Sequence, residues 1–597
     1  MRRSRGSPPP TPATRSSPCG RPSRTGSPDP RVPAGRPSVS ETTHRNGGLA
    51  VVSTLVAHGV DTIFGIPGTH NLEFYRHLPA FGIRAVTPRH EQGAGYGADG
   101  YFLLSGKPGV VITTSGPGLT NVITAAATAY AESRPMLILS PGVPTGLERA
   151  DIGMLHETKD SSGALSHLLV SSQRTRTAEG AAQAVAEAFA LFASSRPGPV
   201  HIEVPLDVLE GAWHGSVPAP IPARRPGLDA HAVTRAAEAI RSASRPVIVA
   251  GGGARAAAAE VAALAESIDA PVATTANGKG IVDEDHPLSL GSNVRFPSVQ
   301  AETAAADVLI VLGSELADSD LWGGTIGAQT APGVRDESAD QVVIRCDIDP
   351  DQLGKNLSGD ILVCADTGEF LTALAAELDA APAAADTPAE DTTTTDGGTA
   401  SARERVETIR AHWGADFDSE RIGARVTRLV AAGAGPDVVI AGDSSQVTYD
   451  GSVHALLAHT PDQLLYMPGF ATLGYGIPAA IGAKVASPQR PVVCVLGDGA
   501  AMFSIQEVMT ATELGLGIPF VIVDNGGYAE IEEQMVDRDM EPFAVRLARP
   551  DFAQLGASMG GVGVSMRESE MTAELPDAVA EALGRAVPTI IHITVGD

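Results

Sequence analysis

The chain alternates short apolar runs of strand length with longer stretches that carry apolar residues at helical spacing. Residues 109–114 and 135–140 are such runs, and the Ala-rich residues 118–133 lie between them. Further apolar runs lie at 246–253, 307–314, 341–349, 437–443, 491–499, 519–525 and 588–595. This alternation predicts parallel strands joined by right-handed helical crossovers. We therefore expect an α/β fold with three doubly wound parallel-sheet domains.

Low-complexity stretches set the expected domain boundaries. Residues 211–227 are Pro-rich, and residues 380–402 hold mainly Ala, Thr, Pro and acids, so both are predicted linkers. Residues 1–45 are rich in Arg, Pro and Ser, which predicts a disordered tail or a start codon chosen too far upstream. A transit peptide is disfavoured because such peptides are usually amphipathic. The remaining blocks are 46–210, 228–379 and 403–597.

The composition argues against nucleic-acid and membrane partners and predicts a cellular location. A net charge of −27 would repel phosphate, which argues against a nucleic-acid partner. The apolar runs are too short to span a membrane, so no membrane partner is expected. The four cysteines (Cys19, Cys346, Cys364 and Cys494) form no CxxC motif and no Cys/His cluster. This pattern predicts a reduced, cytoplasmic location.

Two loops in the third block predict a site for a divalent cation and a diphosphate. Gly497, Asp498 and Gly499 follow an apolar run and lead into a helix, where backbone amides and the helix N-terminus favour a diphosphate. Asp498 offers a carboxylate oxygen to Mg²⁺, and Asn525 and Gly527 after the next run offer an amide and a carbonyl oxygen. A Gly-Asp-Gly turn alone occurs in many α/β proteins, so the pair of loops carries the prediction.

These loops resemble the thiamine-diphosphate-binding fingerprint of the acetolactate synthase and pyruvate oxidase superfamily. That fingerprint usually ends in two asparagines, and the first is replaced here by Asp524. The resemblance runs from about residue 46 and implies a pyrimidine-binding, a central and a diphosphate-binding domain. It also implies thiamine diphosphate, Mg²⁺, and a homodimer or homotetramer with the active site shared between subunits. The central block resembles one that holds FAD in some relatives, but we do not favour FAD here.

Glu91, in the run Arg89 to Ala94, matches the catalytic glutamate of this superfamily. In the family this carboxyl group hydrogen-bonds to the pyrimidine ring, so that the cofactor's own amino group can act as a base. Burial favours the protonated carboxyl that this chemistry needs. The alternative is that Glu91 only caps a helix.

Other site residues follow from the same resemblance. Leu473 takes the position of the apolar wedge that bends the cofactor, although it could be an ordinary core leucine. The carbonyl of Ala471 would accept from the cofactor amino group, and Ser444 and Gln446 lie on a loop on the diphosphate side. His156 would handle protons or bind the substrate carboxylate, or else be structural. The predicted cofactor-binding set is Glu91, Ser444, Gln446, Ala471, Leu473, Gly497, Asp498, Gly499, Ala500, Asn525, Gly527 and Tyr528.

The predicted reaction depends on positions at which this sequence differs from acetolactate synthases. Leu155, His156 and Glu157 replace the usual Phe-Gln-Glu, and the run 528–534 lacks the Trp that favours 2-oxobutanoate as acceptor. Several segments look instead like 5-guanidino-2-oxopentanoate decarboxylases. The acidic run Glu530, Glu532 and Glu533 suits a guanidinium group, although such a helix start is often merely solvated.

We therefore predict a thiamine-diphosphate- and Mg²⁺-dependent enzyme that decarboxylates a 2-oxo acid without oxidation, a lyase. The first alternative is carboligation of the acetolactate synthase type, a transferase reaction that joins two 2-oxo acids. A remote alternative is a degenerate cofactor-binding regulatory protein, but the presence of Glu91, Asp498 and Asn525 counts against it.

Overall fold

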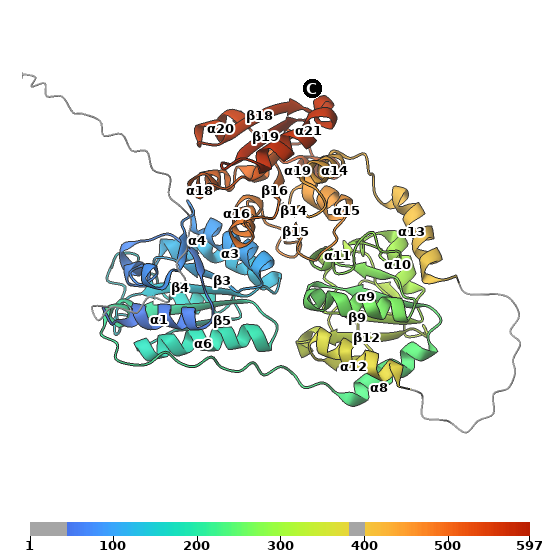
Figure 1. Cartoon of the computed structure of the whole chain (residues 1–597), viewed down its shortest axis with the longest axis horizontal. Helices are drawn as coiled ribbons and strands as arrows, with labels where there is room; N and C mark the ends of the chain where they lie inside the picture. The colour runs from blue at the N-terminus through green and yellow to red at the C-terminus, as the bar shows by residue number, and fades with distance from the viewer. Residues whose placement is uncertain (1–43, 381–399, 597) are drawn as a thin grey trace, which may run out of the picture. The chain divides into compact units, whose positions relative to one another are not determined.

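The computed structural model describes residues 44–380 and 400–596. The predicted tail and almost all of the predicted linker 380–402 fall outside the described residues. Residues 217–228 carry no helix or strand. Three parallel sheets, each covered by helices, confirm the predicted α/β fold class (Figure 1). A short antiparallel pair, β10 (Gln329–Ala331) and β11 (Val334–Arg335), is added to the central part.

The N-terminal sheet has six parallel strands in the order β2-β1-β3-β4-β6-β5. The strands are β1 (Thr62–Gly65), β2 (Arg84–Val86), β3 (Gly109–Ile112), β4 (Met136–Gly142), β5 (Ser171–Arg174) and β6 (Pro199–Pro205). Helices α1 (Gly47–Ala57) and α6 (Ala178–Ser194) cover one face, and α3 (Glu91–Ser105) and α4 (Pro117–Ala131) cover the other (Figure 1). Strand β4 is buried on both faces, as expected for a sheet between two helical layers.

The C-terminal sheet repeats this arrangement, with the order β15-β14-β16-β17-β19-β18. Its strands are β14 (Val439–Ala441), β15 (Leu464–Leu465), β16 (Val492–Gly497), β17 (Pro519–Asp524), β18 (Val562–Arg567) and β19 (Thr589–Thr594). Numbered within each sheet, both orders read 2-1-3-4-6-5. The principal helices are α14 (Ile422–Ala434), α16 (Gly476–Ala486), α19 (Ala529–Val536), α20 (Phe552–Ser558) and α21 (Glu568–Leu583). Because β16 and β17 are paired in parallel, the loops that follow them lie at one edge of the sheet.

The central sheet has five parallel strands in the order β13-β12-β9-β7-β8. They are β7 (Pro246–Ala250), β8 (Val272–Thr274), β9 (Val308–Leu312), β12 (Val342–Asp347) and β13 (Ile361–Cys364). Alternate strand residues contribute to two separate apolar cores, one on each face. Helices α8 (Ala230–Ser242), α9 (Ala258–Ser267) and α12 (Thr367–Asp379) pack on one side, and α10 (Pro297–Ala304) and α13 (Ala402–Asp416) on the other.

Helices α3 and α16 join the N-terminal and C-terminal cores through glycines. A Cβ on Gly482 would lie 1.9 Å from the carbonyl oxygen of Gly97, and one on Gly100 would lie 2.1 Å from that of Ala479. The two backbones therefore approach more closely than any side chain allows. This contact places α3, which begins at Glu91, against the diphosphate-binding domain of the same chain.

In the described part of the chain, no helix combines the length and the apolar character needed to cross a membrane. The cysteines of that part are Cys346, Cys364 and Cys494, and none of them forms a disulfide.

Candidate active site

Three polar groups converge at the carboxyl ends of β16 and β17, namely the Asp498 carboxylate, the Asn525 amide and the Gly527 carbonyl. Asp498 is the first residue of the short helix α17 (Asp498–Ala501), and Asn525 and Gly527 follow β17. The side-chain amide of Asn525 lies 3.2 Å from Oδ1 of Asp498 and 3.2 Å from the carbonyl oxygen of Gly527, and its nitrogen can donate to both. Turned the other way, the same amide would present its oxygen beside the Asp498 carboxylate and the Gly527 carbonyl. The donor set is the one that Mg²⁺ prefers, so these residues fit the predicted metal.

The conformation of Gly527 is required for this arrangement. Its φ is +148°, which L side chains rarely adopt, and a Cβ there would lie 2.1 Å from the carbonyl oxygen of Val545. The N–H of Tyr528 donates to the same carbonyl at 2.9 Å. The backbone after β17 is thereby held so that the Gly527 carbonyl is beside Asp498. Gly497, Gly499 and Ala500, the other predicted diphosphate-side residues, lie at the start of α17 next to Asp498.

Asp524 is paired within the chain. Its carboxylate forms an ion pair with Arg549 at 2.5 Å and accepts from Nε2 of His592 at 2.9 Å. Burial would raise the pKa of Asp524, but these two partners outweigh burial and lower it. Burial and the charge of Asp524 raise the pKa of Asp498 to about 6. The carboxylate that replaces the usual asparagine is therefore compensated by its own cationic partners.

The predicted diphosphate-side loop, residues 442–446, contacts the loop that carries Ala471 and Leu473. The N–H of Ser444 donates to the carbonyl of Thr472 at 3.2 Å, and the N–H of Gly474 donates to Asp443 at 3.0 Å. Asp443 is fully buried, and burial raises its pKa to about 6. The two loops are thus held together on both sides of Leu473.

The predicted cofactor-bending residues lie on one irregular segment. Residues 466–475 connect β15 to α16, and we call them the 466–475 loop. Ala471 has φ +50°, a left-handed conformation that is uncommon outside glycine. Leu473 is partly buried and packs against the core of this domain. The wedge and carbonyl roles of Leu473 and Ala471 remain predictions.

Glu91 is the first residue of α3 and is buried. The cap of this helix is His90, whose Nδ1 accepts from the N–H of Gln92 at 3.1 Å, so Glu91 is not the cap. The Glu91 carboxylate accepts a hydrogen bond from Nδ2 of Asn121 at 2.9 Å. Glu507 of the C-terminal domain accepts from the backbone N–H groups of Arg89 and His90 at 3.0 and 3.1 Å. Glu91 therefore projects from a helix start that is fixed from both domains.

His156 lies beside a second histidine that sequence patterns did not single out. Its ring centroid is 5.3 Å from that of His70, and Nδ1 of His70 is 2.6 Å from Oγ of Ser115. His156 itself has φ +61°, and Gly116 packs directly against its backbone. Burial and then the charge of His156 lower the pKa of His70. Two imidazoles and a hydroxyl thus gather next to the Gly-Pro-Gly turn that begins α4.

The acidic helix α19 leaves two carboxylates without a cationic partner. Glu532 forms an ion pair with Arg546 at 2.6 Å. Glu530 instead accepts from three neutral donors, Gln446 and Tyr449 at 2.9 Å and Gln534 at 2.7 Å. The same Gln446 amide donates to Glu533 at 3.1 Å. In the described part of the chain neither Glu530 nor Glu533 forms an ion pair. We call these two residues the acidic pair.

The Glu91 carboxylate and the Asp498 group make no direct contact by hydrogen bond or ion pair in the described part of one chain. Among described residues, the hydrogen-bond partner of the Glu91 carboxylate is Asn121 of its own domain. Asp498, Asn525 and Gly527 form a separate group after β16 and β17. Glu507 ties the start of α3 to the C-terminal domain, but among the described residues no hydrogen bond or ion pair joins the Glu91 carboxylate to Asp498, Asn525 or Gly527.

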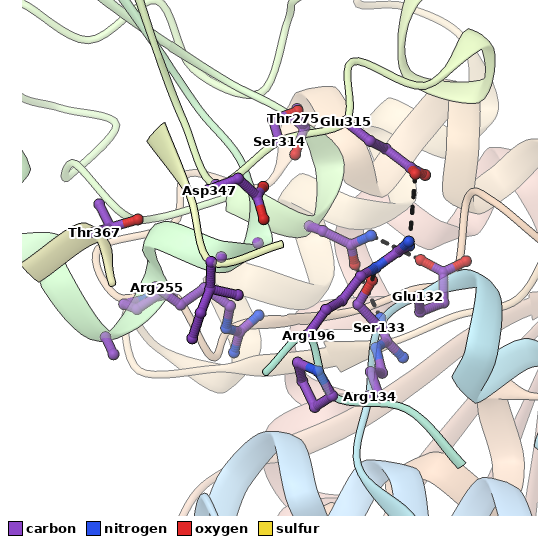
Figure 2. Close-up of a pocket in the computed structure, with 18 of the residues that line it drawn as sticks. Glu132, Ser133, Arg134, Arg196, Arg255, Thr275, Ser314, Glu315, Asp347 and Thr367 are labelled. Carbon is purple, nitrogen blue, oxygen red and sulfur yellow. Dashed lines mark hydrogen bonds and ion pairs between the residues drawn. The ribbon is translucent and has the colours of Figure 1, made fainter. Parts of the chain in front are cut away.

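A cavity of about 700 Å³ lies beside the triple glycine that follows β7 (Figure 2). Its walls include Arg134, Arg196, Arg255 and Asp347. Burial and the charge of Arg134 lower the pKa of Arg255 to about 10, and Arg255 forms no ion pair with any described residue. Our expectation that this domain works without FAD remains a prediction, which visible absorption of the purified protein would test.

Sequence reasoning missed the residues that support the predicted ones. Asn121 and Tyr449 each hold a predicted site residue or one of the acidic pair, and Asp443 accepts from Gly474 next to Leu473, yet none of the three was predicted as a site residue. For Asp443 a signal existed, since it directly follows an apolar run and precedes Ser444. Glu507 is 418 positions from Arg89 in the sequence, so only the fold reveals their contact.

The chain matches known proteins over most of its length. Residues 45–164 match the N-terminal TPP binding domain of thiamine pyrophosphate enzymes, residues 233–374 the central domain and residues 438–593 the C-terminal TPP binding domain. The chain is 36% identical over 560 residues to the probable 2-ketoarginine decarboxylase AruI of Pseudomonas aeruginosa, covering 92% of this chain and 93% of the relative. It is 33% identical over 577 residues to the acetolactate synthase large subunit of Parasynechococcus marenigrum, covering 92% and 87%. It is 30% identical over 574 residues to the acetolactate synthase isozyme 1 large subunit of Escherichia coli, covering 92% and 94%.

Proposed function

Because this chain belongs to the thiamine pyrophosphate enzymes and acts on 2-oxo acids, we propose that it decarboxylates 5-guanidino-2-oxopentanoate without oxidation and releases an aldehyde. The observation that carries this substrate is the acidic pair. Glu530 and Glu533 lie next to Gln446 of the diphosphate-side loop, and neither forms an ion pair with a residue that the structure describes. A guanidinium has several N–H donors in a fixed plane and can bridge two carboxylates.

The neutral donors around Glu530 suit this role. Burial alone would raise the pKa of Glu530, but hydrogen bonds from Gln534, Tyr449 and Gln446, with the charge of Arg421, lower it and keep the carboxylate charged. Because these donors carry no charge, the negative charge of Glu530 remains available to a ligand. The relative AruI is named for decarboxylation of 2-ketoarginine, the same guanidino 2-oxo acid, and this agrees with the proposed substrate.

Different residues of the chain would bind the metal ion, hold a proton at the cofactor and bind the substrate. Asp498, Asn525 and Gly527 would bind Mg²⁺ and, through it, the diphosphate. Glu91 would hold a proton at the pyrimidine ring of the cofactor. When bound, thiamine diphosphate supplies the nucleophilic carbon and the electron sink for loss of carbon dioxide. His156, with His70 beside it, would bind the substrate carboxylate or deliver the final proton.

The geometry of one chain also supports an oligomer. Glu91 and the Asp498 group are each fully built but unconnected, so we propose that a second copy completes each site. A homodimer is the smallest assembly that does so, and a homotetramer can contain two such dimers.

The test is a comparison of substrates and variants. We expect the purified protein, with thiamine diphosphate and Mg²⁺, to release aldehyde from 5-guanidino-2-oxopentanoate, and the Glu91→Gln variant to lose this activity. The Glu530→Gln variant should lose roughly 10- to 100-fold in kcat/KM for the guanidino acid, the size expected for a charge-assisted hydrogen bond, but little for an uncharged 2-oxo acid of equal length. Glu532→Gln, whose carboxylate is already paired with Arg546, is the matched control.

Two outcomes would contradict the proposal. Equal losses on charged and uncharged substrates in Glu530→Gln would remove the acidic pair from substrate recognition. Acetolactate from pyruvate, without aldehyde from the guanidino acid, would instead establish the carboligase alternative, which the relatives named acetolactate synthase keep open.

A further inference from the structure

The 466–475 loop contains a strained residue in its middle. Ala471 has φ +50°, and a left-handed conformation costs an L-residue about 1–2 kcal/mol. Such conformations persist only where the surrounding structure fixes them, and they gather at ligand sites. The contacts that fix this loop therefore show what holds Ala471 in place.

The turn between α4 and β4 holds both ends of this loop. Glu132 accepts hydrogen bonds from the N–H groups of Gly469 at 2.8 Å and Phe470 at 3.2 Å, directly before Ala471. Arg134 donates to the carbonyl of Tyr466 at 2.5 Å and to the hydroxyl of Tyr475 at 3.1 Å. Two charged side chains, two residues apart, thus anchor the beginning, the middle and the end of the loop.

A residue of the central domain completes this anchor. Nδ2 of Asn277 donates to the second carboxylate oxygen of Glu132 at 2.7 Å, and Oδ1 of Asn277 accepts from Arg134 at 3.0 Å. Asn277 thus links Glu132 to Arg134, and we call these three residues, which lie on the wall of the cavity shown in Figure 2, the loop clamp. Arg134 also forms a buried ion pair with Asp99 at 2.6 Å.

The two charged residues of the clamp, Glu132 and Arg134, are buried, and each forms several hydrogen bonds. Glu132 is 8% exposed, and burial raises its pKa although the charge of Arg134 and the three donors described above oppose this. A buried carboxylate with this many donors fixes a single geometry, because the loss of any donor leaves an unpaired buried group.

We propose that Glu132 is a positioning residue for the cofactor, which fixes the Ala471 carbonyl so that it can accept from the pyrimidine amino group of thiamine diphosphate. This inference rests on the proposed function, because it takes Ala471 as the acceptor. Glu132 acts on the cofactor through the backbone of the 466–475 loop and does not contact it. The clamp also makes the central domain, through Asn277, part of the cofactor site.

Calorimetric titration of the Mg²⁺-containing protein with two cofactor forms tests this. One is thiamine diphosphate, and the other is the analogue that lacks the pyrimidine amino group. We expect Glu132→Gln to weaken binding of thiamine diphosphate about tenfold and binding of the analogue by less than about twofold, because only the amino group uses the Ala471 carbonyl. Asn277→Ala, which removes one of the three donors to Glu132 and one acceptor for Arg134, should produce a smaller change with the same selectivity.

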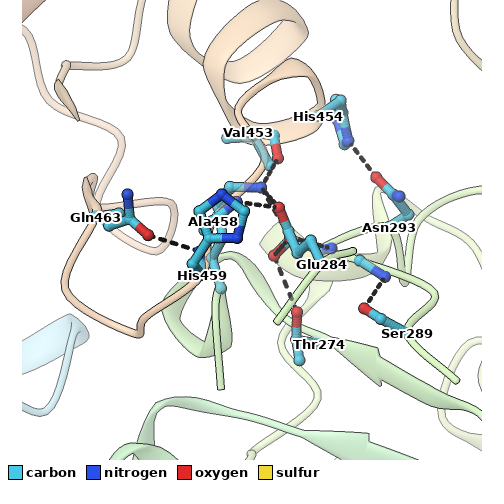
Figure 3. A network of polar contacts seen from close by, with 12 residues as sticks. Thr274, Glu284, Ser289, Asn293, Val453, His454, Ala458, His459 and Gln463 are labelled. Atoms are coloured by element: carbon cyan, nitrogen blue, oxygen red, sulfur yellow. Dashed lines mark hydrogen bonds and ion pairs between the residues drawn. The ribbon is translucent and has the colours of Figure 1, made fainter. Parts of the chain in front are cut away.

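A matched control separates positioning from general stability. Glu284 is also buried, accepts from Lys279 at 2.6 Å, and accepts from the N–H of Ala458 at 2.9 Å (Figure 3). Glu284→Gln should lower Tm and leave the ratio of the two affinities unchanged.

Each contrary result has a distinct meaning. Equal weakening of both cofactor forms by Glu132→Gln, or weakening of neither, would overturn the positioning role while leaving the proposed function intact. A wild-type protein that binds neither form would overturn the proposed function and this inference together.

Discussion

Asp524 shows how a single departure from a family pattern is accommodated. A carboxylate beside Asp498 would repel it, and the charge of Asp524 does raise the pKa of Asp498. Arg549 and His592 lie on the other side of Asp524 and offset much of this charge. The sequence predicted the extra carboxylate next to the predicted metal ligands, but it did not reveal these two partners, since they come from distant segments.

We expect Asp524→Asn to weaken Mg²⁺ binding about tenfold, or about 1.4 kcal/mol. The substitution removes a negative charge near the cation site and leaves Arg549 without a carboxylate. Titration with Mg²⁺ at saturating thiamine diphosphate would measure the change. Asp360→Asn, which removes an arginine-paired carboxylate in the central domain, should leave Mg²⁺ affinity as it is. Tighter Mg²⁺ binding in Asp524→Asn would contradict the inference that the negative charge of Asp524 favours cation binding.

At the scale of elements, the sequence predicted most of the fold. The apolar runs ending near Asp498 and Asn525 are the strands β16 and β17, and their pairing brings the two loops together as expected. Hydrophobic periodicity reports on such local structure. It contains no information on which helix packs on which, so the contact of α3 with α16 and the loop clamp could not be predicted. The clamp residues Glu132 and Asn277 are 145 positions apart and belong to different domains.

The contact of α3 with α16 gives a prediction on stability. Gly482→Ala places a methyl group against the Gly97 carbonyl, so we expect a loss of about 1–3 kcal/mol in the free energy of unfolding. Gly414 lies in α13 with open space around its Cβ position. Gly414→Ala should therefore stabilise the protein slightly, by about 0.4–1 kcal/mol. Chemical denaturation of both variants measures this difference, and losses of equal size would argue against the close helix contact.

At the scale of the whole molecule, the separation of Glu91 from the Asp498 group predicts that two inactive variants can restore activity to each other in a mixed dimer. Glu91→Gln and Asp498→Asn should each be inactive alone. In a mixed dimer with shared sites, one site combines both substitutions and the other is intact. Co-expressed subunits that assort at random should therefore recover about a quarter of wild-type activity.

Absence of any recovery in verified mixed dimers would place each complete site within one chain. Separately purified variants, mixed without subunit exchange, provide the baseline for this measurement.

The identical strand order of the N-terminal and C-terminal sheets has a consequence for the origin of the enzyme. Two domains with the order 2-1-3-4-6-5 are what duplication of one ancestral gene segment would leave. Before that duplication, a pair of identical subunits could already have bound the two ends of one small molecule. After it, each copy was free to specialise, one toward an acidic helix start at Glu91 and the other toward a cation at Asp498. The division of labour between the domains would then be a record of descent as well as a requirement of chemistry.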